Sequence, residues 1–499
     1  MRGKILRNVK KFIAIETKCY NKPKQIYNST QPLLAALHKR DLIYLYIYFC
    51  MLKCVFLKNL HERKAKMKNS NHANSAHSAN LSENFAPQTA CTAERQKAIK
   101  NTIYASLGGI LEFYDFILYV FFAVAIFPQI FFPPNSDIWA SVGGWVSFGV
   151  AYLARPFGAV VFGHFGDKFG RKKIFYISML LMVLPSFVLA FLPTYESIGI
   201  AATLALFAIR IIQGLAVGAD VSGVWVFVSE FVSEKNKSLA LGFISASTTF
   251  GLLLAGLVAF WVNSSFTNDE VLEYAWRLPF ILGGFFGILA CFLRKRLSET
   301  PVFERLQQTK QILKFPLVEA LKTHKMPMLV CFLMSIVLSA GVATLTIIPQ
   351  NFDKLLGFDA SERLLYTNLA IVAVIIGALV QGLLARFFGE YKICAIFACL
   401  FALFGFGVGL YDENFLAFYL LACFCQGIIT FAPVFMTRVF ASQLRLSGLS
   451  FAYNVSYAFF VFISPFVINA LYERYLGYYM SFVALACLAC VWLMKRLGH

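Results

Sequence analysis

The sequence contains little charge. Only 14% of its 499 residues are Asp, Glu, Lys or Arg, against roughly 25% in an ordinary soluble domain. In contrast, 59% of the residues are hydrophobic, Phe alone occurs 53 times, and the mean hydropathy is +0.67. A water-soluble fold cannot bury so much apolar surface, whereas a lipid bilayer accepts it. The composition therefore excludes a soluble domain and predicts an all-α, polytopic membrane protein.

The sequence also lacks the residue patterns of metal, redox and hydrolytic sites. Cys487 and Cys490 have CxxC spacing, but they lie in an apolar run, where Cys packs as a small hydrophobic residue. His164 is interpreted as a loop residue and not as a metal ligand. No nucleophile–base or metal-ligand constellation occurs in the apolar runs, so we expect neither an enzyme nor a cofactor.

The net charge of +19 is concentrated near the N-terminus. Residues 1–100 hold 19 Lys and Arg against 5 Asp and Glu, whereas the other 399 residues hold 26 and 21. A basic chain can bind nucleic acid or an anionic membrane surface, but the apolar body argues against nucleic acid. We predict that residues 1–98 form a basic, largely disordered extension.

The extension has two interpretations. Its apolar run Leu42–Leu57 is short and interrupted by Lys53, so it is marginal as a membrane span, and the polar segment Lys68–Asn80 predicts disorder. The favoured interpretation is that translation starts at Met67, which would leave out the apolar run. The alternative is that the apolar run forms an additional membrane anchor.

Twelve apolar runs follow, each close to the roughly 20 residues that a helix needs to cross a bilayer. We place them at 103–130, 138–162, 174–193, 199–228, 239–262, 277–293, 327–349, 364–385, 393–411, 415–437, 447–470 and 477–494.

The loops predict the orientation and the division of the body. One side carries 20 Lys and Arg and the other side carries 4. Because basic residues concentrate in cytoplasmic loops, both ends of the body are predicted to be cytoplasmic. Residues 294–326 then form a cytoplasmic linker between a first half, 99–293, and a second half, 327–499.

The two halves echo one another. GHFGDKFGRKK (Gly163–Lys173) follows the second span and GLLARFFGEYK (Gly382–Lys392) follows the eighth, so that their glycines align with an offset of 219. A Gln-Gly pair in the fourth span recurs in the tenth with an offset of 213. These offsets predict a duplicated six-helix unit. Such repeats are typical of secondary transporters, which bind substrate between their halves.

These residues resemble the major facilitator superfamily. The first loop is similar to its G-x-x-x-D-[RK]-x-G-R-[KR]-[KR] motif, and Arg210–Gly214 is similar to its R-x-x-Q-G motif. The stretches Gly108–Phe122, Leu153–Lys173 and Trp276–Leu306 resemble the metabolite:proton symporters of this superfamily. The resemblance covers residues 100–495. It implies a fold of two six-helix halves and import of compounds such as α-ketoglutarate, citrate, shikimate, proline or betaine.

The sequence departs from the family pattern at three places. Gly218-Ala219-Asp220 stands where helix 4 of the family reads Gly-Gly-Glu, which shortens the acidic side chain. The second loop has Arg386 where the motif has an acid and Glu390 where it has a base. The Gly-Pro pair of the antiporters is missing from the fifth span, which disfavours efflux.

Charged residues within the spans are expensive, at about 2.5–3.5 kcal/mol each, so each needs a reason. All of them lie in the first half, whereas the second half offers neutral polar groups such as Gln381. We therefore expect the first half to handle charge and protons. The charged residues are Glu112, Asp115, Arg155, Arg210 and Asp220.

Glu112 and Asp115 are three residues apart and share one face of a helix. A carboxyl group that binds a proton on one side of the membrane and releases it on the other can couple transport to protons. We therefore predict a proton-coupling set of Asp115, Glu112, Arg210 and Asp220. The alternative is that Asp115 only neutralises Arg210.

Arg155 also has two interpretations. Its guanidinium could bind a substrate carboxylate, but pairing with Asp220 or Glu230, which would close the cytoplasmic side, is favoured. Aromatic residues such as Trp225 and Tyr453 could line a cavity. The candidate substrate-binding residues are Tyr114, Arg155, Gln213, Gln426 and Asn454.

The first loop predicts a gate. Gly163 and Gly170 permit close helix approach and a tight turn. Asp167 can cap a neighbouring helix and contact Arg171. With Glu230, these residues form the predicted gating set.

The leading hypothesis is a monomeric inner-membrane transporter that imports a small organic carboxylate or zwitterion with protons by alternating access. A proton-driven efflux antiporter of the same fold and a non-transporting membrane sensor are the alternatives.

Overall fold

A computed structural model describes residues 88–123, 126–133, 137–352, 356–409, 414–471 and 476–498. The apolar run Leu42–Leu57, the segment Lys68–Asn80 and the candidate start at Met67 lie outside these residues. The first helix, α4 (Gln88–Ala123), already begins within the segment that was predicted to be disordered up to residue 98.

The described part of the chain contains twelve helices that are long and apolar enough to cross a membrane, which confirms the predicted number. The first half consists of α4, α6 (Asp137–Phe169), α7 (Arg171–Ala190), α9 (Ile200–Phe231), α10 (Glu234–Ser265) and α12 (Arg277–Lys295). The second half consists of α15 (Lys325–Val342), α17 (Ala360–Phe388), α18 (Glu390–Gly409), α19 with α20 (Phe415–Cys425 and Phe431–Val439), α21 (Arg445–Leu471) and α22 (Leu476–Arg496).

Short elements connect these helices. The first predicted span, 103–130, was placed too far toward the C-terminus, because α4 ends at Ala123 and a separate helix, α5 (Phe127–Phe131), starts with Pro128 in its first turn. Helices α8 (Tyr195–Ile198) and α11 (Asn268–Glu270), followed by a π-helical turn at Val271–Ala275, lie with α5 at one end of the bundle.

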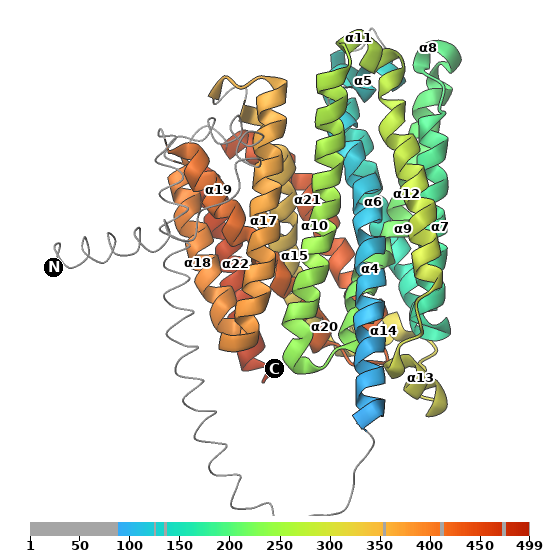
Figure 1. Cartoon of the computed structure of the whole chain (residues 1–499), viewed down its shortest axis with the longest axis vertical. Coiled ribbons are helices and arrows are strands. Elements are labelled where there is room, and N and C mark those ends of the chain that lie inside the picture. The colour runs from blue at the N-terminus through green and yellow to red at the C-terminus, as the bar shows by residue number, and fades with distance from the viewer. Residues whose placement is uncertain are drawn as a thin grey trace, which may run out of the picture. The chain divides into compact units, whose positions relative to one another are not determined.

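The opposite end carries the segment between the halves, with α13 (Pro301–Gln308) and α14 (Pro316–Thr323) (Figure 1). We call this the linker end. Two spanning helices of the second half are irregular. Helix α15 continues as a π-helical turn (Ala343–Ile347) and a 3-10 turn (Ile348–Asn351), and a 3-10 turn at Gln426–Thr430 joins α19 to α20.

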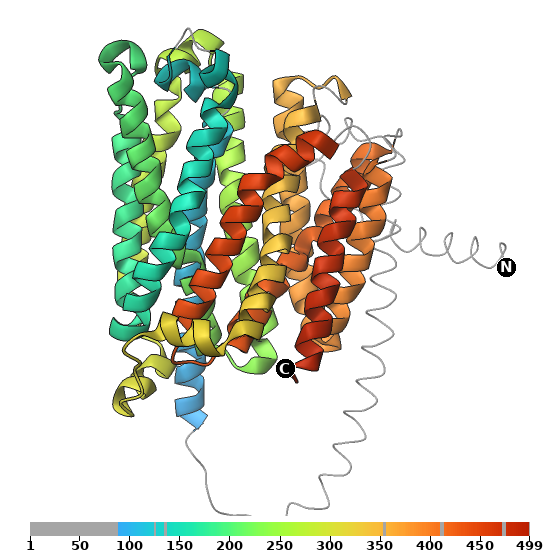
Figure 2. The same cartoon turned by 180° about the vertical axis from the view of Figure 1, so that it is seen from behind.

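The six spanning helices of each half stand together, and the two groups lie side by side in both views (Figures 1 and 2). Helix α6 packs on α21, and α10 packs on α17. These contacts pair the second helix of one half with the fifth helix of the other, in both directions. The interface therefore has the internal symmetry that the sequence echo predicts.

The aligned loop glycines have the same backbone conformation. Gly170, between α6 and α7, has φ +105°, and Gly389, between α17 and α18, has φ +90°. Side chains other than glycine rarely adopt this conformation. The repeated glycines therefore serve the same tight turn in both halves.

Candidate functional site

A buried arginine from the end of α12 joins two acids of the first half. The guanidinium of Arg294 donates two hydrogen bonds to Asp220, one of them 2.6 Å long, and donates another of 2.7 Å to Oε2 of Glu112. All three side chains are at most 3% exposed. Ser178 of α7 also donates to Asp220 at 2.6 Å. Helices α4, α7, α9 and α12 thus meet in one ion-pair cluster, the Arg294 cluster.

Asp115, one turn along α4, has separate partners. Ser186 of α7 donates to its Oδ2, and Nε2 of Gln213 lies 3.4 Å from the same oxygen. Oε1 of Gln213 in turn accepts a 2.8 Å hydrogen bond from Arg210, whose guanidinium lies 3.7 Å from the ring centre of Tyr119. Gln213 therefore stands between Asp115 and Arg210, and no ion pair joins them among the described residues.

Arg155 of α6 crosses the interface between the halves. Its Nε donates to Oδ1 of Asn454 at 2.9 Å and its Nη2 donates to the hydroxyl of Tyr453 at 3.1 Å, both on α21. Three tyrosine rings surround the guanidinium, with centres at 5.3 Å (Tyr152), 5.4 Å (Tyr453) and 4.7 Å (Tyr457). Arg155 is 3% exposed.

A cavity of about 110 Å³ lies between the two halves. The first half lines it from α4, α6, α9 and α10, and the second half lines it from α15, α21 and the irregular turns that follow α15 and α19. Its charged lining residues are Glu112 and Arg155. The wall is otherwise aromatic or aliphatic, with hydroxyl groups from Ser245, Thr248, Thr249 and Thr346.

At the linker end, Asp167 of α6 contacts the start of α21. Its Oδ2 accepts hydrogen bonds from the backbone N–H and the hydroxyl of Ser447, at 2.8 and 2.7 Å. Its Oδ1 lies 3.4 Å from Arg171. The predicted helix-capping contact and the contact with Arg171 are both present. A Cβ at Gly163 would lie 3.2 Å from Cα of Ser447, so this glycine allows the close approach of the two helices.

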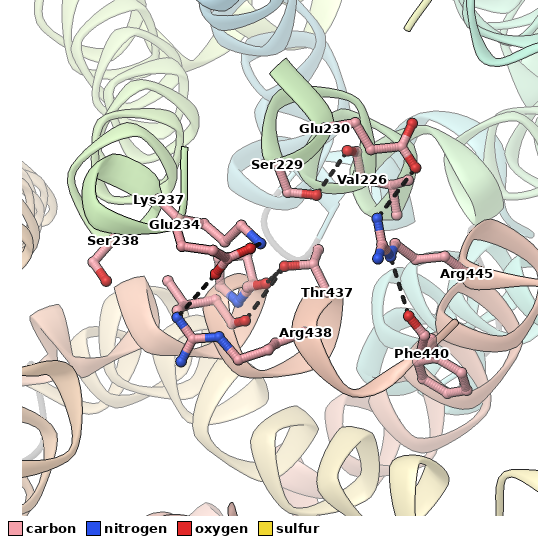
Figure 3. A network of polar contacts seen from close by, with 12 residues as sticks. Val226, Ser229, Glu230, Glu234, Lys237, Ser238, Thr437, Arg438, Phe440 and Arg445 are labelled. Atoms are coloured by element: carbon pink, nitrogen blue, oxygen red, sulfur yellow. Dashed lines mark hydrogen bonds and ion pairs between the residues drawn. The ribbon is translucent and has the colours of Figure 1, made fainter. Parts of the chain in front are cut away.

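Two ion-pair triads at the linker end repeat the internal symmetry with opposite signs. Figure 3 shows one ion pair of each triad, Glu230 with Arg445 and Glu234 with Arg438. The first triad joins Glu230 of α9 to Arg171 of α7 and to Arg445 of α21, with N–O distances of 3.3 Å in both pairs. The second triad joins Arg438 of α20 to Glu390 of α18 and to Glu234 of α10. In each triad the third and fourth helices of one half meet the fifth helix of the other half.

A family model and several relatives match this chain. The model described as the Major Facilitator Superfamily matches residues 106–443. The chain belongs to the major facilitator superfamily. It is 31% identical over 417 residues to the inner membrane metabolite transport protein YhjE of Escherichia coli (strain K12), and the alignment covers 80% of this chain and 94% of YhjE.

Further similarities agree with this assignment. A putative proline/betaine transporter of Staphylococcus aureus (strain MSSA476) is 27% identical, with 75% of this chain and 82% of the relative covered. The solved structure of the proton:xylose symporter XylE, bound to 6-bromo-6-deoxy-D-glucose, aligns with a TM-score of 0.66 at 17% identity over 81% of this chain and 97% of XylE. The protein is thus a multi-pass membrane transporter with the major facilitator fold, and not an enzyme.

The structure corrects several site predictions for this facilitator. Arg155 does not pair with Asp220 or Glu230. Asp220 pairs with Arg294 instead, and Glu230 pairs with Arg171 and Arg445. Glu112 and Asp115 share a helix face but have separate partners, and the second acid at Arg294 is Asp220.

Only one of the five candidate substrate-binding residues, Arg155, is among the residues that line the cavity. Tyr114 donates to the carbonyl of Pro279 on α12, Gln213 contacts Arg210, and Gln426 donates to the carbonyl of Val337. Asn454 does not line the cavity itself, but it accepts a hydrogen bond from Arg155, which does.

Proposed function

We propose that this facilitator imports a small organic metabolite together with protons by alternating access. The observation that carries the proposal is the cavity between the halves, which combines an arginine bonded across the interface with a buried carboxyl group. A site shared by both halves changes its surroundings when the halves rock against each other, which is the requirement for alternating access.

The buried acids support proton coupling. Glu112 and Asp115 each have one carboxyl oxygen that is buried without a hydrogen-bond partner in the described part of the chain. A protonated carboxyl group is a donor as well as an acceptor, so proton uptake changes what these groups can bind. We assign the coupling to these two acids, with Arg210 and Asp220 as the partners that respond to it.

The triads and the Asp167 contact support a gate at the linker end. Asp167 and Glu230 bind residues of α21, and Arg171 donates to the carbonyl of Ser442 just before that helix. These bonds must break when that end opens. Because the linker end carries the basic loops, we place it in the cytoplasm and place the chain in the inner membrane. The cavity is complete within one chain, which supports a monomeric transporter.

The relatives' names support a metabolite as the substrate. The E. coli relative is described as a metabolite transport protein and the S. aureus relative as a putative proline/betaine transporter. A carboxylate is common to many metabolites, and Arg155 can bind it through paired hydrogen bonds. We therefore propose a carboxylate or a zwitterion as the substrate.

Transport by the purified chain in proteoliposomes tests the proposal. We expect a pH gradient, alkaline inside, to drive accumulation of at least one compound from a panel of labelled carboxylates, proline and betaine, and we expect a protonophore to abolish it. Accumulation driven by the opposite gradient would identify an efflux antiporter. Absence of any gradient-driven movement would contradict the proposal.

The double variant Glu112→Gln/Asp115→Asn should lose accumulation driven by the pH gradient but keep exchange of labelled for unlabelled substrate. The amide side chains mimic the protonated acids, so the substrate still binds while no proton is carried. The measurements are the steady-state accumulation ratio and the counterflow rate in the same proteoliposomes. A double variant that still accumulates substrate in response to the gradient would show that other groups carry the proton.

A further inference from the structure

The cavity contains one buried cation without a carboxylate partner. The ion pairs of the described residues occupy Arg171, Lys237, Arg294, Arg438 and Arg445, and none involves Arg155. An amide oxygen and a hydroxyl take two of its donors, and a guanidinium has five. A buried charge is costly unless it is paired. The tyrosine rings offset part of this cost through their π faces.

The second charged lining residue, Glu112, already forms an ion pair. It binds Arg294, which also holds Asp220, so one cation serves two acids. With both acids ionised, the Arg294 cluster carries one net negative charge that partly compensates Arg155 across the cavity. When Glu112 is protonated the cluster becomes neutral, and the positive charge of Arg155 is then available to an anion.

Glu112 has polar and charged neighbours on several helices. Asp115 on its own helix is bonded to Ser186 and Gln213 and belongs to a separate set. The surrounding polar and charged groups are Arg294 of α12, Asp220 of α9, Ser178 of α7 behind Asp220, Arg155 and Tyr152 of α6, Ser245, Thr248 and Thr249 of α10, and Tyr453 and Tyr457 of α21.

From this arrangement we infer that the substrate is an organic anion with a single acidic group, which binds Arg155. Of the two coupling acids, Glu112 lines the cavity and carries the single proton that accompanies each anion. The inference rests on the proposed proton-coupled import. A single unpaired cation matches one carboxylate. The rest of the wall, which is aromatic and aliphatic with a few hydroxyls, matches an uncharged body.

The same geometry disfavours a zwitterion. An ammonium group would need a π face or a carboxylate. The guanidinium of Arg155 already lies against the rings of Tyr152, Tyr453 and Tyr457, and a second cation there would be repelled. Phe116 lies against Arg210, which leaves Phe113 and Trp225 as the lining aromatic residues without a cation at their rings in the described part of the chain. The lining carboxylate, Glu112, is bound to Arg294. A second acidic group on the substrate would likewise find no free cation among the lining residues.

Proton and anion therefore bind cooperatively. Each removes a charge that opposes the other, and the coupling between the two sites is reciprocal. Affinity for the anion should rise as the pH falls. One proton with one monoanion also carries no net charge, so the transport cycle should be electroneutral.

The first test separates the driving forces in proteoliposomes that contain the full chain. The labelled probes are the monocarboxylates lactate, gluconate and quinate, their neutral counterparts lactamide, glucitol and inositol, and the zwitterions proline and betaine. We expect a pH gradient to drive accumulation of a monocarboxylate and not of its neutral counterpart, and we expect a valinomycin-induced membrane potential alone to drive none.

The outcomes distinguish the two proposals. Accumulation of proline or betaine by the potential alone would overturn the anion inference and leave proton-coupled import intact. Failure of every probe to respond to either gradient would overturn import itself, and with it the inference.

The second test uses variants of the two lining charges and measures binding of the transported monocarboxylate between pH 5.5 and 8. Arg155→Gln should weaken binding at least tenfold at every pH. Glu112→Gln should bind with an affinity that no longer depends on pH and should lose accumulation. A Glu112→Gln protein that keeps the pH-dependence of the parent would overturn the role of Glu112.

The matched controls are Arg305→Gln and Glu304→Gln on α13, which remove the same charges at exposed positions. They should bind as the parent does. If Arg155→Gln does not fold, Arg155→Lys is used. It keeps the charge but loses the paired hydrogen bonds, and it should retain the pH-dependence with weaker binding.

Discussion

Replacing Arg294 by Gln is expected to destabilise the protein by about 3–5 kcal/mol, because it leaves Glu112 and Asp220 buried without their cation. Both acids are at most 3% exposed, and Arg294 donates hydrogen bonds to each. The measurement is the unfolding free energy in detergent micelles or bicelles, compared with the parent chain. The same substitution should also abolish gradient-driven transport, since Glu112 loses the partner that sets its charge.

The triple variant Arg294→Met/Glu112→Gln/Asp220→Asn provides the decisive comparison. It removes the acids together with their cation, so it should recover most of the lost stability while remaining inactive. Lys295→Gln, the exposed neighbour, is the matched control and should unfold like the parent. An Arg294→Gln protein within about 0.5 kcal/mol of the control would contradict the buried-cluster argument.

The role of Arg294 illustrates what the sequence could predict. Hydrophobicity alone predicted twelve spans, because a bilayer imposes one length on every helix. It also assigned Arg294 to the linker, because a basic residue at the end of an apolar run usually marks the membrane boundary. The charged residues within the predicted spans did indicate that a further cation must be buried. They comprised three acids and two arginines, and an unbalanced buried acid requires another cation.

Individual contacts between the halves could not be predicted from the sequence. The repeated glycines predicted the duplicated unit, since each half needs the same turn. The partner of Arg155 could not be predicted, because it lies 299 positions away on α21 and is an amide, which gives no charge signal. The sequence shows that Arg386 and Glu390 depart from the motif. It does not show that Glu390 pairs with Arg438, which only the structure reveals.

The two triads have opposite signs but the same place in the fold. Each triad holds the two halves together with an ion pair to the fifth helix of the other half, Arg445 to Glu230 and Glu234 to Arg438. One triad has two cations and one acid, and the other has two acids and one cation. Asp167 also pairs with Arg171, and Lys237 also pairs with Glu234, so each network as a whole has as many cations as acids.

Arg445→Glu should therefore open the linker end. It replaces an attraction to Glu230 by a repulsion and leaves three carboxylates around Arg171, two of them from Asp167 and Glu230. The expected change in the ratio of open to closed conformations is at least about tenfold, which corresponds to about 1.4 kcal/mol. Spin labels at Lys173→Cys and Lys392→Cys, both at exposed positions of the linker end, report the distance between the halves in a background without native cysteines.

Reversing the whole first triad separates charge from packing. The variant Arg171→Glu/Glu230→Arg/Arg445→Glu restores every ion pair within the triad and reproduces the signs that Glu390, Arg438 and Glu234 already use. It should close the linker end partly but not fully, because Asp167 loses its cation and then faces a carboxylate at position 171. Full closure would show that only the local ion pairs matter. A label distance equal to that of Arg445→Glu would show that side-chain shape, and not charge, holds this end closed.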